Sequence, residues 1–360
     1  MIKFLLIIFL LGSLSGLYGQ NNFRIPIEEA DKILEELIFR QDVVGATICV
    51  GMQDSIIHAN GYGFVNKDDS TQAESWHKFR IYSLSKHITA IAAAKLSEEG
   101  RLNLDRSIVT YIPFLNENLH NITTRQLIGH ISGIRSYREG EWQVVSNERC
   151  SSPFESILSF QSDSLLFTPG EDIHYTSFGY VLLSAVIEKV TGKQFIKYIN
   201  EDILYPIGVT NLTLDNPDIF DSLAAAPYEY WKETMYDARY ANNTCKFGGG
   251  GFSASTSDIV KFNLALLNGE IVNSKTLEMI FSSMKLKDGT ETNYGFGLEF
   301  STDEKGRKYA WHSGRSRGGR NALVIYPEYN LIVCISMNTN GERIVNETIN
   351  VAKGFVNRIN

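Results

Sequence analysis

The sequence contains no run of basic side chains that could neutralise a phosphate backbone. Its 34 lysines and arginines are outnumbered by 41 aspartates and glutamates, which gives a formal net charge of −7 at pH 7 and a pI near 5.6. Binding to nucleic acids and to anionic membrane surfaces depends on clustered positive charge, so this balance argues against both partners. A local positive site is still compatible with it.

Cysteine is scarce, at four residues in 360. Cys49, Cys150, Cys245 and Cys334 lack the close spacing of metal ligands, so we expect no zinc site and no cofactor. Cys49 and Cys334 lie in β-branched, strand-like runs, where a cysteine is usually a small buried apolar residue. The disulfide pattern is left open, because four cysteines can pair in more than one way.

Beyond its first residues the chain also lacks any apolar run of the ~20 residues that a membrane-spanning helix requires. At the N-terminus, Lys3 precedes an apolar run over residues 4–11 and a stretch rich in small residues over 12–19. This pattern is typical of a secretory signal peptide, predicted as residues 1–19 with cleavage after Gly19. We therefore expect a secreted or periplasmic protein, with an uncleaved anchor as the alternative.

The mature chain, residues 20–360, has a predicted helix at each end, over residues 27–41 and 347–360. Next to these helices lie strand-like runs bounded by turn residues, namely 45–53, 55–66, 294–302, 308–314, 321–328 and 331–338. The middle, roughly residues 100–270, is mostly helical in pattern. We expect an α/β (α+β) fold with one antiparallel sheet formed by both chain ends, flanked by helices, and a helical inserted subdomain.

The pattern Ser-x-x-Lys occurs at three places in the chain, Ser75–Lys78, Ser83–Lys86 and Ser282–Lys285. The spacing alone says little, because serine and lysine are common on helix surfaces. Ser75 lies in a polar stretch, and Ser282 lies at or beyond the end of a predicted helix.

Ser83 differs because it begins a predicted helix that continues to a stop at Gly100. Residues three apart share a helix face, so Lys86 would lie beside Ser83. Free N–H groups at a helix start also favour a developing negative charge. Ser83 and Lys86 are therefore candidates for an activated nucleophile and its base. The alternative is a simple helix-capping serine beside a solvated lysine.

Five ordered segments, residues 79–115, 122–137, 167–195, 247–269 and 294–314, resemble the serine beta-lactamase and penicillin-binding protein superfamily. The resemblance covers about residues 30–350 and is nearest to the class C beta-lactamase, D-amino-acid peptidase and esterase branch. It is also similar to the mitochondrial beta-lactamase-like proteins. Several segments in the family's order are far more specific than one short motif. The resemblance implies a beta-lactamase/transpeptidase-like fold.

By this resemblance Ser83 matches the acylated serine and Lys86 the lysine that takes or relays its proton. Tyr175, in HYTSFGY, matches the tyrosine of the family's Tyr-x-Asn element, which passes a proton to the leaving group. Tyr198 and Tyr240 fit the bare Tyr-x-Asn pattern better. We prefer Tyr175 because it follows FTPGE and precedes a long apolar helix, as in the family, and we keep Tyr240 as a competitor.

His312, Ser313 and Gly314 match the family's Lys-Thr-Gly strand in a variant that opens with histidine. The backbone N–H of Arg315 would then join that of Ser83 as the second oxyanion donor. Without the resemblance, His312 would be interpreted as a partly buried, hydrogen-bonded histidine. Lys246 begins another matching triplet, KFG, but a glycine run and a helix follow it where a strand is required, so we do not assign it.

Two departures from the family bear on specificity. Ser177 stands where the family usually has an asparagine that binds the substrate's acylamide, which puts efficient recognition of beta-lactams in doubt. Arg315, Arg317 and Arg320 follow the HSG triplet, and a guanidinium there could bind a substrate carboxylate in a bidentate manner. The alternative is that these arginines are solvated loop charges.

These residues predict a secreted serine hydrolase that cleaves an amide or ester bond through a seryl ester intermediate. The expected substrate is a small molecule or peptide, such as a beta-lactam, a D-amino-acid peptide, an ester or a muropeptide fragment. The alternative function is a penicillin-binding sensor or a self-assembling structural protein with little turnover, for which Ser177 is the motivating feature. The oligomeric state is left open.

Overall fold

The computed structural model describes residues 23–40, 43–141, 148–239, 241–341 and 344–359. The expected signal peptide and Tyr240 lie outside these residues. No helix in the described part of the chain is long and apolar enough to cross a membrane.

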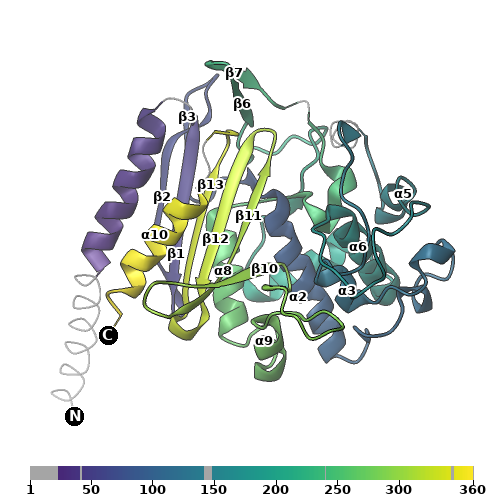
Figure 1. Cartoon of the computed structure of the whole chain (residues 1–360). Helices are drawn as coiled ribbons and strands as arrows, with labels where there is room; N and C mark the ends of the chain where they lie inside the picture. Colours follow the sequence, from purple (N-terminus) through teal and green to yellow (C-terminus); the bar gives the residue numbers. More distant parts are fainter. Residues whose placement is uncertain (1–22, 41–42, 142–147, 240, 342–343, 360) are drawn as a thin grey trace, which may run out of the picture.

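Within the described residues, eight strands form one antiparallel sheet to which both chain ends contribute (Figure 1). In spatial order they are β3 (Thr71–Gln72), β2 (Ser55–Asn66), β1 (Gly45–Met52), β13 (Leu331–Met337), β12 (Gly319–Tyr326), β11 (Lys308–Ser316), β10 (Leu298–Thr302) and β9 (Tyr294–Gly295). The two ends meet where β1 pairs with β13, in a register that places Cys49 opposite Cys334. The predicted fold class is therefore confirmed.

β1 and β13 are internal strands of the sheet, and both faces of the sheet are covered there. Successive side chains of a strand point to opposite faces. Val50 and Val333 pack with the helix over residues 23–39 and with α10 (Val345–Val356), which cover one face in Figure 1. Cys49 and Cys334 point to the other face and join the core of the helical side. These two cysteines are therefore small buried apolar residues, as expected.

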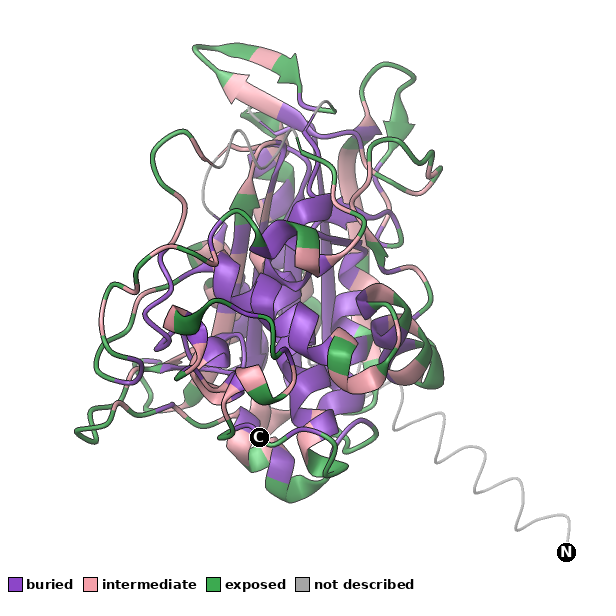
Figure 2. Ribbon diagram, turned by 90° about the vertical axis from the view of Figure 1, so that its right-hand side faces the viewer, coloured by how far each residue is buried: buried purple, intermediate pink, exposed green. Residues whose placement is uncertain are grey.

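The opposite face carries the larger group of helices, among the described residues. They are α2 (Ser85–Glu98), α3 (Thr124–Ile128), α5 (Pro153–Ile157), α6 (Ser177–Thr191), α7 (Phe195–Tyr198), α8 (Thr256–Leu267) and α9 (Ser274–Ile280). Three short strands, β4 (Phe79–Arg80), β5 (Thr213–Leu214) and β8 (Phe252–Ala254), pair together. A separate hairpin is formed by β6 (Tyr228–Trp231) and β7 (Thr234–Asp237). Figure 2 shows the exposed residues gathered on the β6–β7 hairpin and the outer loops, around a buried centre.

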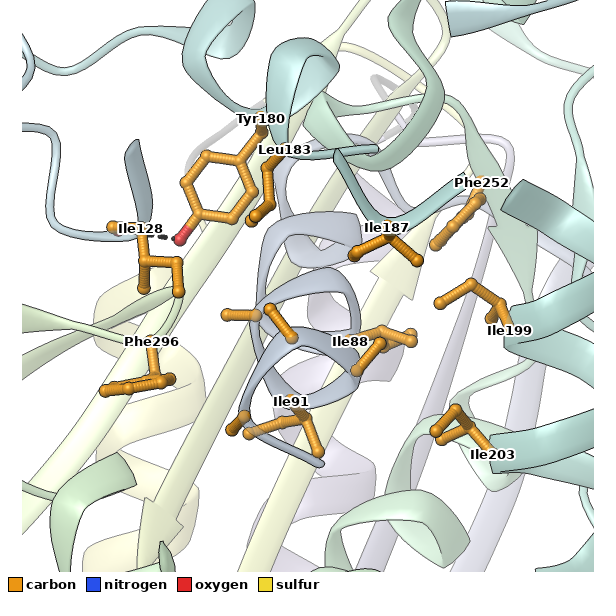
Figure 3. Close-up of a cluster of buried hydrophobic side chains, with 14 of the residues drawn as sticks. Ile88, Ile91, Ile128, Tyr180, Leu183, Ile187, Ile199, Ile203, Phe252 and Phe296 are labelled. Atoms are coloured by element: carbon orange, nitrogen blue, oxygen red, sulfur yellow. Dashed lines mark hydrogen bonds between the residues drawn. The ribbon is translucent and has the colours of Figure 1, made fainter. Parts of the chain in front are cut away.

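Helix α2 is the centre of the helical side and is buried almost all round. Four of its buried positions are alanines, at 90 and 92–94, and such small side chains let neighbouring helices approach closely. Ile88 and Ile91 lie among side chains of several other elements, including Leu183 and Ile187 of α6 (Figure 3). The expected helix is therefore present, but it is a buried core helix without a solvated face, and its α-helical part begins at Ser85.

A disulfide joins Cys150 to Cys245 and leaves Cys49 and Cys334 as free, buried cysteines. It connects the segment before α5 to the turn Thr244–Gly249 across a sequence separation of 95 residues. A cross-link over so long a loop removes much of the unfolded chain's conformational freedom.

We expect replacement of both disulfide cysteines by serine, in the variant C150S/C245S, to lower the free energy of unfolding by roughly 2–5 kcal/mol. Thermal or denaturant unfolding measures this loss. As a control, dithiothreitol should lower the Tm of the wild type and leave that of the double variant unchanged. A wild type that is equally stable with and without reductant would contradict the expectation.

Candidate active site

Ser83 lies in a tight turn that connects β4 to α2. Residues Tyr82–Leu84 form a single 3-10 turn, and Tyr82 has a φ of +46°, a backbone conformation that is uncommon for a bulky residue. The Tyr82 hydroxyl donates to the carbonyl of Arg317, which ties the turn to the loop after β11. The N-cap residue of α2 is Leu84, and no side chain caps the helix there. Ser83 is therefore not a helix-capping serine, contrary to the alternative considered from the sequence.

Lys86 is fully buried, and its Nζ contacts oxygens of the neighbouring Ser83 turn and of two segments distant in the sequence. It lies 3.0 Å from Ser83 Oγ and 3.2 Å from Ser177 Oγ, and it donates to the carbonyl of Gly249. Among the described residues it has no carboxylate partner. Burial, assisted by the charge of Lys246, lowers the pKa of Lys86 well below its usual value. A neutral amine that donates to Gly249 and Ser177 keeps its lone pair for the Ser83 proton.

Tyr175 lies on the other side of this pair. Its ring centre is 4.9 Å from Lys86 Nζ, and the Ser83 side chain is near enough to influence the pKa of its hydroxyl. Tyr175 keeps 41% of its surface exposed, yet the protein packed around it raises its pKa by desolvation. The phenol therefore stays protonated at neutral pH. Tyr198, the competitor that the structure describes, is buried in the core at the end of α7.

His312 is buried on β11, and its ring centre lies 6.0 Å from that of Tyr175. Its Nδ1 donates to the carbonyl of Ser313 at 2.8 Å, and its Nε2 lies 3.4 Å from the Tyr294 hydroxyl. Burial, followed by the nearby Lys86 charge, lowers the pKa of His312 to about 3. His312 is therefore a neutral imidazole, unlike the lysine that opens this triplet elsewhere in the superfamily.

Gly314 lets β11 lie directly against the Ser83 turn. A Cβ at this position would lie 2.1 Å from the carbonyl oxygen of Ile81 and 3.2 Å from the backbone nitrogen of Ser83. The Ser83 N–H therefore lies beside the strand that carries Arg315, the residue expected to supply the second oxyanion donor. Ser313 and Gly314 also line a neighbouring cavity of about 390 Å³.

A larger cavity of about 870 Å³ opens at Ser83 and is rich in positive charge. Ser177, the first residue of α6, lines it with the hydroxyl that contacts Lys86. The expected substrate-binding arginines, Arg315, Arg317 and Arg320, line it as well. Arg320 donates to the carbonyls of Ser316 and Gly319, and Arg317 Nε lies 3.6 Å from Glu229. In the described part of the chain no group of three or more His, Cys, Asp or Glu side chains could hold a metal.

The structure adds residues that sequence reasoning did not place at the site. Lys246 lines the cavity, although the sequence pattern did not assign it to a motif. The Gly249 carbonyl accepts a hydrogen bond from Lys86. His130 lies buried between Tyr175 and Tyr294, with ring centres 4.3 and 4.7 Å away. Its Nδ1 accepts the backbone N–H of Thr176 at 3.2 Å. His130 lies in the GHISG segment that carried the resemblance, which was the available signal.

An antiparallel sheet completed by both chain ends, with a serine–lysine pair between the sheet and a helical side, is the architecture of the serine beta-lactamase and penicillin-binding protein superfamily. The sequence profile of the Beta-lactamase family matches residues 30–353, and the chain belongs to that family. The superfamily inferred from the sequence is therefore confirmed.

Known relatives agree with this assignment. The chain is 25% identical over 399 residues to the human mitochondrial serine beta-lactamase-like protein LACTB, with 85% of this chain and 73% of that protein covered. The octameric penicillin-binding protein homologue from Pyrococcus abyssi has a TM-score of 0.79 at 25% identity, covering 92% and 76% of the two chains. The D-amino acid amidase of Ochrobactrum anthropi SV3, complexed with L-phenylalanine amide, shares the fold with a TM-score of 0.79 at 21% identity, covering 92% and 98%.

We expect Gly314→Ala to abolish activity, because the added methyl group would push β11 away from the Ser83 turn. The readout is the hydrolysis of a p-nitrophenyl ester. Gly354→Ala is the control, since a Cβ there meets its nearest atom at 3.5 Å, and in helix α10 alanine is the better helix former. Wild-type activity in Gly314→Ala would show that the close approach of β11 is not required.

Proposed function

We propose that the chain is a secreted serine hydrolase that cleaves amide or ester bonds through a seryl ester intermediate on Ser83. The observation that carries the proposal is the buried Lys86, whose pKa is lowered and whose Nζ lies 3.0 Å from Ser83 Oγ. The family to which the chain belongs suggests the same general activity. Residues 20–360 would form the mature hydrolase domain, related to the class C branch, with the helical subdomain over roughly 100–270.

Export is supported by two independent features. Residues 1–19 have the pattern of a signal peptide. Cys150 and Cys245 form a disulfide, which is typical of proteins that work in an oxidising compartment. A secreted or periplasmic location accounts for both.

In the proposed acylation step, Ser83 Oγ attacks the carbonyl carbon of the substrate and its proton passes to the lone pair of Lys86. The negative oxygen of the tetrahedral intermediate is stabilised by the backbone N–H groups of Ser83 and Arg315. Tyr175, which keeps its proton at neutral pH, donates it to the departing amine or alcohol, and Lys86 returns a proton to Tyr175. Water then attacks the seryl ester, and the acid product leaves.

The preferred substrate is a small ester or short peptide with a free carboxylate. The cavity at Ser83 carries four cationic side chains, Lys246, Arg315, Arg317 and Arg320, against the single acid Glu229. Ser177 is the reason to expect weak recognition of beta-lactams. Its hydroxyl faces Lys86 and cannot offer both the carbonyl and the amino group of an asparagine. We therefore propose poor turnover of penicillins and cephalosporins.

Ser83→Ala should abolish turnover of a p-nitrophenyl ester and prevent labelling by a fluorophosphonate probe, measured by intact-protein mass spectrometry. Its Tm should stay close to that of the wild type, since Ser83 does not cap α2. Ser282→Ala, at the exposed copy of the Ser-x-x-Lys pattern, is the matched control and should retain full activity. More than a few per cent of wild-type turnover in Ser83→Ala would refute the nucleophile, and a stable adduct without product release would favour the non-hydrolytic alternative.

Tyr175→Phe removes only the proton-donating hydroxyl, and general acid–base help is typically worth ~10²–10⁴ in rate. We expect kcat/KM for an amide substrate to fall within that range. Tyr198→Phe is the control, because the buried Tyr198 hydroxyl has no hydrogen-bond partner among the described residues. Equal losses in the two variants would mean that Tyr175 acts through packing and not through proton transfer.

A further inference from the structure

Lys246 is a second buried lysine at the proposed active site, and the mechanism above does not use it. It lies in the turn Thr244–Gly249, directly after the disulfide residue Cys245. Only 6% of its surface is exposed, yet it lines the same cavity as Ser83. Its Nζ is 6.0 Å from the centre of the ring of Tyr82, the residue that precedes Ser83.

The Lys246 ammonium has no hydrogen-bond or salt-bridge partner among the described residues. The nearby acid Asp215 is already bound to Arg80, at 2.8 Å between Nε and Oδ2, and also accepts from Asn243. Burial, followed by the charge of Arg80, lowers the pKa of Lys246 to about 8. Burying a charge without a partner costs free energy. A lysine in such a place therefore indicates a role in binding more than a role in packing.

The two arginines whose charge acts on Lys246 each have an acid beside them. Arg80 is balanced by Asp215, and Arg317 faces Glu229 at 3.6 Å. A lone ammonium matches a monoanion such as a carboxylate better than a phosphate dianion, which would need further donors. The lining of the cavity also includes Gly249, Gly250, Tyr82 and Trp231. The Trp231 side chain is largely exposed.

The position of Lys246 also indicates which half of the substrate it meets. Tyr175 and His312 are not among the residues that line the cavity holding Lys246. If Tyr175 protonates the leaving group, the leaving group departs on the Tyr175 side of Ser83. The cavity with Lys246 is then left for the acyl half of the substrate.

We propose that Lys246 forms the base of a subsite that binds a carboxylate carried by the acyl half of the substrate. This inference rests on the proposed function and narrows it to a substrate class: monoesters and monoamides of dicarboxylic acids, and peptides whose acyl residue has an acidic side chain.

The test compares two p-nitrophenyl esters of the same acyl chain, mono-p-nitrophenyl glutarate and its neutral methyl ester. We expect the wild type to prefer the carboxylate form by roughly ten- to a hundredfold in kcat/KM, as for a charge-assisted hydrogen bond. Lys246→Met should reduce this ratio to near one, mainly through KM for the carboxylate form, and Lys246→Arg should keep much of it. Lys285→Met, at an exposed lysine, should leave the ratio unchanged.

A binding measurement tests the carboxylate subsite separately from the hydrolase activity. Glutarate is titrated calorimetrically into Ser83→Ala, alone and combined with Lys246→Met, and we expect the second substitution to weaken Kd by roughly tenfold. Ser83-dependent hydrolysis with no carboxylate preference, or glutarate binding that ignores Lys246, would overturn the subsite and leave the hydrolase intact. If neither ester shows Ser83-dependent turnover, the hydrolase proposal fails, and a Lys246-dependent Kd would still support the carboxylate site.

Discussion

Lys86 is buried without an acidic partner among the described residues, and this is the constraint on which the proposed active site depends. A lysine in water is a cation and cannot take a proton from serine, whereas desolvation favours the neutral amine. The oxygens of Ser83, Ser177 and Gly249 satisfy Nζ without supplying a negative charge that would hold the proton on it. The proposed proton transfer from Ser83 therefore depends on an amine that the protein hydrogen-bonds but does not pair with a negative charge.

The surrounding packing exists to bring these oxygens together. The turn Thr244–Gly249 can approach α2 and α6 only because it is made of glycine at two points. A Cβ on Gly248 would lie 2.3 Å from Thr89 Oγ1, and one on Gly249 would lie 2.6 Å from the carbonyl oxygen of Ser177. The Cys150–Cys245 disulfide anchors the same turn from its other end. A single short segment thus carries both Lys246 and the Gly249 carbonyl that accepts from Lys86.

The distribution of charge matters more here than its total. The whole chain is acidic, with a net charge of −7, yet the cavity at Ser83 is lined by four cations and one acid. The acidic surface argues against nucleic acid as a partner, and the cationic cavity favours an anionic small molecule. His312 is neutral and so offers no positive charge to an anion, which is consistent with anion binding by the cationic side chains of the cavity.

The sequence by itself determined the architecture and the motif residues. The β-branched runs at both ends and the helical pattern between them predicted a shared antiparallel sheet, because strand and helix periodicities are local properties. Ser83, Lys86, Tyr175, Ser177, His312 and Gly314 could be proposed as site residues because each belongs to a short segment that resembles the superfamily.

Only the tertiary structure decided how these residues lie relative to one another. The pairing of Cys150 with Cys245, the 3-10 turn at Ser83 and the burial of α2 on nearly all sides depend on segments far apart in the chain. The place of Lys246 in the cavity at Ser83 depends on such segments as well. So does the contact between Lys86 and the Gly249 carbonyl, which are 163 positions apart. The pKa of a lysine is set by the atoms that surround it in space, and a linear sequence does not contain that information.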